Sequence, residues 1–322
     1  MRSIDIHTHV LPPELPRWVG FMRIERIDDC RARMVRADGA LFREIGSNCW
    51  DPAVRLRECD EAGIGVQVVS TVPVMFAYQR EGDDLARFLN DHLASLCREQ
   101  PRRFVGLGTL PMQSPDLAVK ELERCMRDLH FAGVQIGSHV NDWNLSDPAL
   151  FPVFARAAEL GAAVFVHPWD MMGQERMQRY WLPWLVGMPA EVSLAICSVI
   201  FGGVLERLPS LRIAFAHGGG AFPGTLGRIE HGFRSRPDLV AIDNPHPPSH
   251  YLKRIYVDSL VHDVRALRLV LEVFGADRVA LGSDYPFPLG EWPPGALIQS
   301  MDFAPAVRDR LLFGTAQEWL GQ

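Results

Sequence analysis

The feature that most constrains the fold is an alternation of short β-rich runs with longer segments of helical apolar spacing along all 322 residues. Eight β-rich runs can be recognised: IDIHTHV (4–10), GVQVVSTV (65–72), RFVGLGTLP (103–111), GVQIGSHV (133–140), AAVFVHP (162–168), LRIAFAHGGG (211–220), RIYVDS (254–259) and RVALGSDYP (278–286). A segment with the periodicity of an amphipathic helix follows each of them. Eight such pairs predict an α/β fold, a (β/α)8 TIM barrel, as a single domain over residues 1–322.

A doubly wound open sheet is the structural alternative, because it has the same alternation. No G-x-G-x-x-G motif follows the first β run and the chain contains no P-loop, so the barrel is favoured. Residues 11–50 interrupt the alternation with an arginine-rich, partly alternating stretch. We expect this stretch to be a small insertion after the first strand, folded as an antiparallel flap.

The composition indicates which kind of binding partner and which cellular compartment to expect. The hydrophobic fraction of 48% predicts a large buried core, and a net charge of −6 without a long basic run argues against nucleic acid and anionic membranes. The six cysteines have no C-x-x-C spacing, so we expect them to be reduced. With no leader pattern and no apolar run of membrane-spanning length, we expect a cytoplasmic protein that acts on a small molecule.

Five side chains able to bind a metal fall at the ends of predicted strands. His7 and His9 point to the same side of the first strand, because strand side chains alternate. His167 ends the fifth run, His217 the sixth and Asp284 the eighth. Alone, such a histidine is more often a core residue and such an aspartate a turn former. Barrel closure would bring all five to one mouth, where three imidazoles and a carboxylate suit Zn²⁺ and His217 could act as an acid or base.

This pattern resembles that of the amidohydrolase superfamily over the whole barrel. The resemblance implies that His7, His9, His167 and Asp284 hold the metal, while His217 and Asp284 take part in proton transfer.

The resemblance also bears on the number of metal ions. Binuclear members of that superfamily bridge two metals through a carboxylated lysine on the fourth strand. Here the fourth run begins GVQIGS (133–138), and the only lysines, Lys120 and Lys253, lie elsewhere. We therefore expect one Zn²⁺ per subunit.

Longer stretches resemble one decarboxylase branch of the superfamily: WDPAVR (50–55), TVPVMF (71–76), VHPWDMM (166–172), WLPWLVGMPAE (181–191), AHGGGAFP (216–223) and SDYPFPLGE (283–291). The resemblance implies a metal-dependent carboxy-lyase that needs neither O₂ nor an organic cofactor and acts on a ring-opened dicarboxylate.

A dicarboxylate substrate calls for arginines, whose planar guanidinium groups pair with carboxylates in a bidentate manner. The resemblance implies that Arg43 comes from the insertion and that Arg228 and Arg236 come from the neighbouring subunit of a homodimer. Trp181, with Trp169 and Phe287, is a candidate for the pocket wall. Without the resemblance, each of these arginines would be interpreted as a surface charge.

Three other functions stay open on the sequence alone. A hydrolase of an amide or lactone would use the same metal chemistry. A benzoate-type decarboxylase would need fewer arginines. A barrel that has lost catalysis could act as a binding scaffold, although the five strand-end residues argue against this. Release of CO₂ would distinguish a decarboxylase from the hydrolase. Metal analysis that finds no bound transition metal would favour the inactive scaffold.

Overall fold

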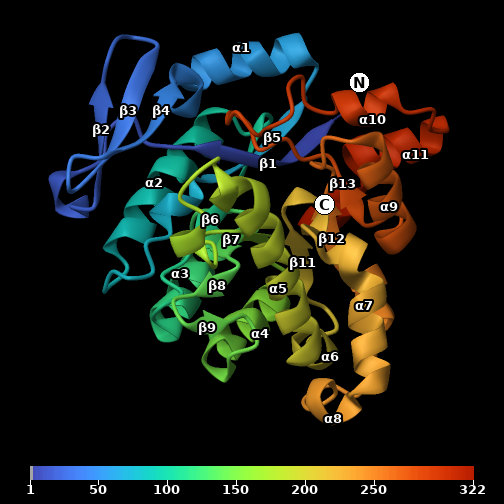
Figure 1. Ribbon diagram of the computed structural model, residues 1–322. Coiled ribbons are helices and arrows are strands. Elements are labelled where there is room, and N and C mark those ends of the chain that lie inside the picture. Colours follow the sequence, from blue (N-terminus) through green and yellow to red (C-terminus); the bar gives the residue numbers. More distant parts are fainter. Residues whose placement is uncertain (1–2) are drawn as a thin grey trace.

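The computed structural model describes residues 3–322 and contains the predicted barrel (Figure 1). One parallel sheet contains, in spatial order, β1 (Ile4–Val10), β5 (Val66–Thr71), β6 (Phe104–Thr109), β7 (Gly133–Gly137), β10 (Ala163–His167), β11 (Arg212–Phe215), β12 (Ile255–Asp258) and β13 (Val279–Ala280). Bonds between β1 and the segment after β13 close the sheet, namely Ile6 N to Leu281 O (2.9 Å) and His9 N to Tyr285 O (2.8 Å). The predicted (β/α)8 fold is confirmed.

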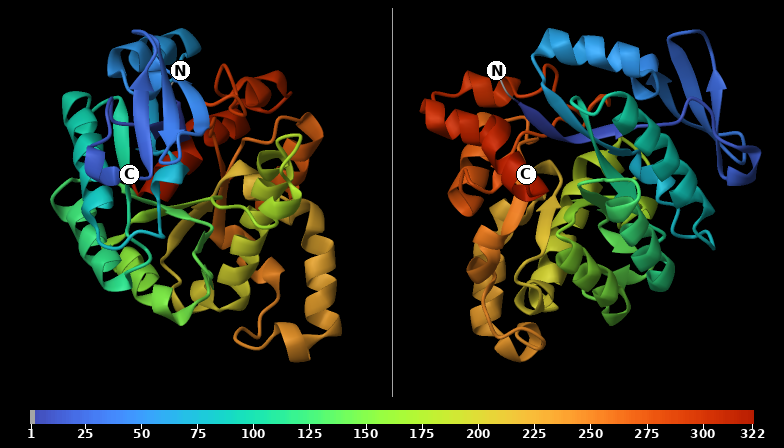
Figure 2. Two further views of the ribbon diagram at one scale, coloured as in Figure 1. Left: turned by 60° about the vertical axis from the view of Figure 1, so that its left-hand side comes forward. Right: turned by 180° about the vertical axis from the view of Figure 1, so that it is seen from behind.

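Helices surround the strands, as the two further views show (Figure 2). The longer ones are α1 (Pro52–Ala62), α2 (Asp84–Glu99), α3 (Pro115–Arg127), α4 (Phe151–Leu160), α5 (Met188–Phe201), α7 (Phe222–Ser235), α9 (Val264–Phe274) and α12 (Thr315–Leu320). The shorter ones are α6 (Val204–Arg207), α8 (Pro237–Val240), α10 (Ala296–Ser300) and α11 (Pro305–Asp309). This order matches the predicted alternation of strands and helices.

The barrel interior is filled by side chains and is not a pore. The ring of Phe165 lies 4.9 Å from that of His7 and 5.9 Å from that of Trp319, measured between centroids. Trp319 belongs to α12 and is fully buried. Burying a side chain the size of Phe165 contributes about 2–3 kcal/mol. The histidine at the mouth therefore stands on a packed apolar layer.

The insertion after β1 forms a separate antiparallel sheet of β2 (Met22–Arg26), β3 (Arg31–Arg36) and β4 (Leu41–Gly46). Its strands project from the barrel (Figure 2). One face packs on the barrel through Met34 and Ile45, which share a buried cluster with Leu89 of α2. The predicted antiparallel flap is therefore present.

Two late strands are shorter than predicted. The run 211–220 is strand only over Arg212–Phe215, and the run 278–286 only over Val279–Ala280. Gly218 adopts a positive φ of 62°, and a Cβ there would lie 2.3 Å from Val261, so the chain turns at this point. His217 and Asp284 therefore lie on turns just beyond their strands. The fourth run also divides, into β7 and a short hairpin of β8 (His139–Val140) and β9 (Trp143–Asn144).

The expectation that no apolar segment reaches membrane-spanning length is wrong. Residues Pro183–Phe201 form a 19-residue helical segment with a mean hydropathy of 1.8. Of this segment 44% is buried, and Val192, Ile196 and Val199 belong to the main core cluster. Length and apolar composition alone therefore do not distinguish a core helix from a membrane-spanning helix.

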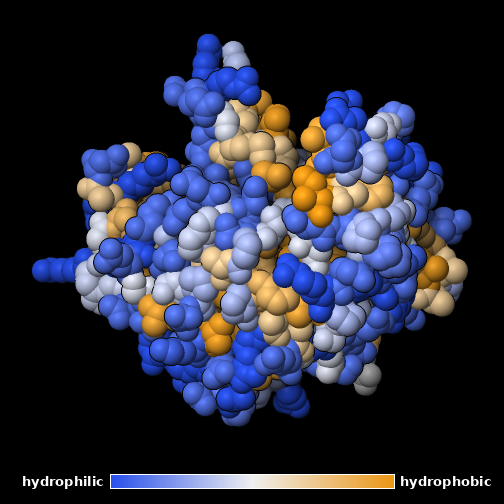
Figure 3. All heavy atoms as spheres, turned by 90° about the horizontal axis from the view of Figure 1, so that it is seen from below, coloured by the Kyte–Doolittle hydropathy of each residue, from blue (hydrophilic) through white to orange (hydrophobic). Residues whose placement is uncertain are grey.

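The face of the molecule in Figure 3 is largely hydrophilic, with apolar side chains in small groups.

Candidate active site

The five side chains predicted at the strand ends converge at the mouth of the barrel. His9 Nε2 lies 3.2 Å from His7 Nε2 and 2.9 Å from Asp284 Oδ1. One possible ligand atom from each of His7, His167, His217 and Asp284 lies within 4.8 Å of the other three. His217 Nε2 is 4.0 Å from Asp284 Oδ2. All five therefore lie close enough together to surround one ion.

Backbone geometry brings the two turn residues into this cluster. His217 and Asp284 have positive φ values of 57° and 55°, a conformation that costs a non-glycine residue about 1–3 kcal/mol. Hydrogen bonds hold both in place: Asp284 N donates to His7 O at 2.8 Å, and His217 N donates to Asp258 Oδ2 at 2.9 Å. Strained residues that the surrounding structure holds in this way are typical of functional sites.

The outer hydrogen bonds fix the tautomers of two of these histidines. His9 Nδ1 lies 3.0 Å from Thr71 O, and His167 Nδ1 lies 2.7 Å from Pro168 O. A carbonyl oxygen only accepts, so each Nδ1 carries the hydrogen and each neutral ring turns a bare Nε2 lone pair toward the cluster. His167 Nε2 is buried and has no hydrogen-bond partner among residues 3–322. Lone pairs that face one another and a carboxylate fit a cation between them.

The protonation states also suit a metal. Burial lowers the pKa values of His9 and His167, and it lowers that of His217 to about 4, so these rings are neutral at pH 7. Burial alone would raise the pKa of Asp284, but its close contacts with the His7 and His9 rings hold that pKa well below its usual range. Neutral imidazole and ionised carboxylate are the forms that bind metals.

His7 is the exception among these rings. Burial alone would lower its pKa, but its hydrogen bonds to Asp258 and Asp284 raise the pKa to about 10. A proton on His7 Nε2 occupies the position that a metal ion would take.

Asp258 is a site residue that the sequence reasoning missed. It ends β12, and its Oδ2 lies 2.7 Å from His7 Nδ1 while also accepting from His217 N. Its Oδ1 accepts from Gly218 N at 2.8 Å. One buried carboxylate therefore orients two of the five residues. A Cβ at Gly282 would lie 2.6 Å from that of Asp258, so glycine is needed there. The available signal was its position at a strand end, in RIYVDS.

Gln135 lies on β7, the fourth barrel strand, which contains no lysine that could bridge two metals. Its Oε1 accepts from Ser70 Oγ at 2.5 Å, and its Nε2 donates to Thr71 O at 3.0 Å. The same Thr71 oxygen accepts from His9. The amide is fully buried and supports a histidine.

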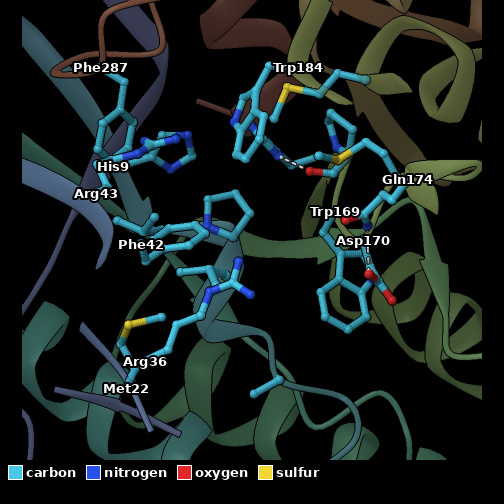
Figure 4. A pocket seen from close by; sticks show the side chains of 18 of the residues that line it. His9, Met22, Arg36, Phe42, Arg43, Trp169, Asp170, Gln174, Trp184 and Phe287 are labelled. Carbon is cyan, nitrogen blue, oxygen red and sulfur yellow. Dashed lines mark hydrogen bonds between the residues drawn. The ribbon is translucent and has the colours of Figure 1, made fainter. Parts of the chain in front are cut away.

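A cavity of about 520 Å³ extends outward from His9, His167 and Asp284. Arg43, on β4, lines it with its Cζ 4.2 Å from the centroid of the Phe287 ring (Figure 4). Trp181, which is 43% exposed, contributes to the same wall. The structure therefore places Arg43 and Trp181 on the wall of one cavity, and their contact with substrate stays a prediction.

The rest of the wall includes predicted and unpredicted residues. Trp169 and Phe287 line the cavity, as expected. Arg36 at the end of β3 also lines it, and the sequence reasoning missed this residue (Figure 4). Trp184, which is stacked on Trp181 at 5.8 Å, does so too.

Arg228 and Arg236 do not line the cavity of their own chain. Arg228 is exposed on α7, and Arg236, just beyond that helix, pairs with Asp238 at 2.6 Å. The prediction places both at the site of a partner subunit. It stays a prediction.

Comparison with known proteins identifies the family of this chain. The chain belongs to the amidohydrolase family, whose model matches residues 4–322. It is 53% identical to a 2-amino-3-carboxymuconate-6-semialdehyde decarboxylase of Dictyostelium discoideum, with 99% of this chain and 91% of that protein covered. It is 37% identical to the Caenorhabditis elegans protein of the same name, covering 99% and 94%. The predicted resemblance and enzyme class, a carboxy-lyase, are confirmed.

A solved structure supports the fold independently of close sequence similarity. The dihydroxybenzoic acid decarboxylase of a Polaromonas species superimposes with a TM-score of 0.77 at 21% identity, covering 99% of this chain and 96% of that one. That protein was crystallised with manganese and 2-nitroresorcinol. The family and the His/Asp cluster together indicate a divalent metal.

Proposed function

We propose that this protein converts 2-amino-3-carboxymuconate-6-semialdehyde into 2-aminomuconate-6-semialdehyde and CO₂, without O₂, in the 3-hydroxyanthranilate branch of the kynurenine pathway. The observation that carries this proposal is the 53% identity to a decarboxylase of that name over nearly the whole chain. A cavity that joins an arginine-bearing wall to the His/Asp cluster adds support, because the substrate is a dicarboxylate. We further propose a cytoplasmic homodimer.

The metal proposed is one Zn²⁺ per subunit, held by His7, His9, His167 and Asp284. Three nitrogen ligands and one oxygen ligand are a common zinc set. The bare Nε2 of His167 supports a bound ion, and the absence of lysine from the fourth strand, GVQIGS, supports a single one. When bound, such an ion supplies Lewis acidity and acidifies a coordinated water.

The chain's own residues would divide the remaining work. Arg43 pairs with a substrate carboxylate and orients the diene against Trp181. Arg228 and Arg236 of the partner would hold the second carboxylate. His217, neutral at pH 7, accepts a proton from water with the help of Asp284 and delivers it to the carbon that bears the departing carboxylate, and the remaining hydroxide recovers a proton from solvent. The bond to that carboxylate then breaks, its electron pair returns to the diene, and CO₂ leaves.

The test supplies freshly made substrate and follows its absorbance together with CO₂ release, with and without EDTA. We expect one CO₂ for each substrate consumed, and we expect the chelator to abolish both signals. Consumption without CO₂ would indicate a hydrolase. Turnover of 2,6-dihydroxybenzoate in place of the muconate would indicate a benzoate-type decarboxylase. Decay that ignores EDTA would contradict the metal role.

A further inference from the structure

Arg55 is a buried cation that the proposed chemistry does not use. It lies on α1 and is only 1% exposed. Its Nη1 and Nη2 both donate to the carbonyl oxygen of His9, at 2.9 and 2.6 Å, and Nη1 also donates to Asn48 O at 3.0 Å. Its Cζ lies 4.7 Å from the centroid of the Tyr285 ring. The guanidinium therefore contacts backbone and an aromatic face.

Among residues 3–322 no carboxylate forms an ion pair with Arg55. Glu58, one turn further along α1, instead accepts from Tyr285 Oη at 2.6 Å and from Asn48 Nδ2 at 3.1 Å. A buried charge without a partner is costly, and arginines are seldom buried unless paired. Three hydrogen bonds to backbone carbonyls and the face of the Tyr285 ring therefore offset the cost of burying this charge.

The contacts of Arg55 lie where the first and last strands of the barrel meet. His9 supplies one nitrogen to the cluster, and Tyr285 directly follows Asp284, which supplies a carboxylate. His9 N also donates to Tyr285 O at 2.8 Å. One guanidinium therefore contacts both the backbone of His9 and the ring of the residue that follows Asp284. The side chains of His9 and Asp284 themselves lie 2.9 Å apart, from Nε2 to Oδ1.

We propose that Arg55 is a positioning residue that sets the spacing of His9 and Asp284 for a divalent ion. The inference rests on the metal role proposed for these two side chains. Its forked donors lock the end of β1 through the His9 carbonyl, while its face restrains Tyr285 and hence the turn that carries Asp284. A lysine at this position could donate to one carbonyl oxygen, but it could not contact both the His9 carbonyl and the Tyr285 ring in this way.

The chain offers a matched control at the other end of the barrel. Arg103 donates to the backbone carbonyls of Gly65 and Ile64, at 2.9 and 3.2 Å, just before β5. It is 26% exposed and pairs with Asp60 at 2.8 Å. It resembles Arg55 in contact type but lies far from the cluster, so its loss reports on general destabilisation.

The test compares Arg55→Met, Arg55→Lys and Arg103→Met in the full-length protein after metal removal and titration with Co²⁺. Visible d–d absorption reports the coordination geometry, and competition with a chelating dye gives the affinity. Loss of a residue that orients a metal ligand typically weakens metal binding about 10- to 100-fold. We expect that loss and an altered spectrum in Arg55→Met, a smaller loss in Arg55→Lys, and neither change in Arg103→Met. If Arg55→Met fails to fold, Arg55→Lys decides.

A rescue experiment separates positioning from bulk stability. In Arg55→Ala, added methylguanidinium should restore the Co²⁺ spectrum, whereas methylammonium should not. The proposal is overturned if the Arg55 variants keep wild-type affinity and spectrum, or if Arg103→Met shifts both equally. If the wild-type chain binds Co²⁺ but does not consume the muconate, the proposed substrate is wrong, whereas the positioning role of Arg55 is not contradicted.

Discussion

The two ends of the cavity are built differently. At the inner end, His7, His9 and His167 are buried on barrel strands, and each has a second hydrogen bond that fixes its ring. At the outer end, Arg36 is exposed on the flap and Trp181 lies on a loop. The contrast teaches that barrel strands and their hydrogen bonds fix the clustered side chains, whereas the flap and loops form the wall that the proposed substrate would meet. Changes at the inner end should alter metal binding and kcat, and changes at the outer end should alter KM.

The largest effect is expected from His167→Ala. It removes the Nε2 nitrogen that we propose as a metal ligand, an atom that is buried and has no hydrogen-bond partner among residues 3–322. A bound ion supplies several kcal/mol of transition-state stabilisation, so kcat/KM should fall by about 10³-fold or more. Metal content by mass spectrometry should fall with it. His130→Asn, at an exposed positive-φ position that asparagine tolerates, is the control for loss of a histidine. Full metal content and rate in His167→Ala would remove it from the centre.

His217→Ala should lower kcat about 10²- to 10⁴-fold, the usual contribution of a positioned acid or base. The metal should stay bound, because His7, His9, His167 and Asp284 remain. This measurement bears on an ambiguity in the geometry, since His217 also lies within 4.8 Å of three candidate ligands. Loss of the metal together with the rate would place His217 among the ligands and require another residue to move the proton.

Asp258→Asn keeps the shape of the side chain but removes the negative charge facing His7. Carboxylates that hold a ligating histidine typically contribute 10–100-fold to metal affinity or activity, and we expect a loss of about that size. Chelator competition measures it. Asp263→Asn is the control, because Asp263 caps α9 through Arg265 N and Ala266 N and so affects stability alone. Equal metal affinity in the two variants would deny Asp258 an orienting role.

The residues at the inner end of the cavity can be predicted from the sequence because the topology of the barrel determines where they meet. Once eight strands alternate with eight helices, residues at the strand ends must meet at one mouth. His7, His9 and His167 follow from that rule alone. Asp258 obeys the same rule, but an aspartate after a strand is also a common turn former, and nothing in its own run indicates that it faces His7.

The outer end could not be predicted in this way. Arg36 reaches the cavity because β3 pairs with β2 in a register that sets Met22 opposite Arg36, and strand alternation alone does not give that register. The turns that carry His217 and Asp284 were predicted as strand for a related reason. Their positive φ values are imposed by contacts with Asp258 and His7 that are distant in sequence.

Arg43→Met should raise KM while leaving metal content unchanged. Its guanidinium is half-buried on the cavity wall against Phe287 and would pair with a substrate carboxylate. A hydrogen bond to a charged group contributes about 1.5–3 kcal/mol, which predicts a 10- to 100-fold loss in kcat/KM. Arg43→Lys should restore only part of it, because lysine cannot pair in a bidentate manner. Metal loss in Arg43→Met would mean that the flap supports the inner end as well.

The smallest effect is expected from Arg36→Ala. Its side chain is exposed at the rim, and an exposed ion pair contributes less than about 1 kcal/mol, or roughly fivefold in kcat/KM. That contribution should fade between 0.05 and 0.5 M salt, because the screening length falls with ionic strength to about 10 Å at 0.1 M. Steady-state kinetics at several salt concentrations would test this. The deficits of the inner variants should persist in high salt, since buried contacts are poorly screened. If the loss of kcat/KM in Arg36→Ala is as large and as insensitive to salt as that of the inner variants, the proposed difference between the two ends is wrong.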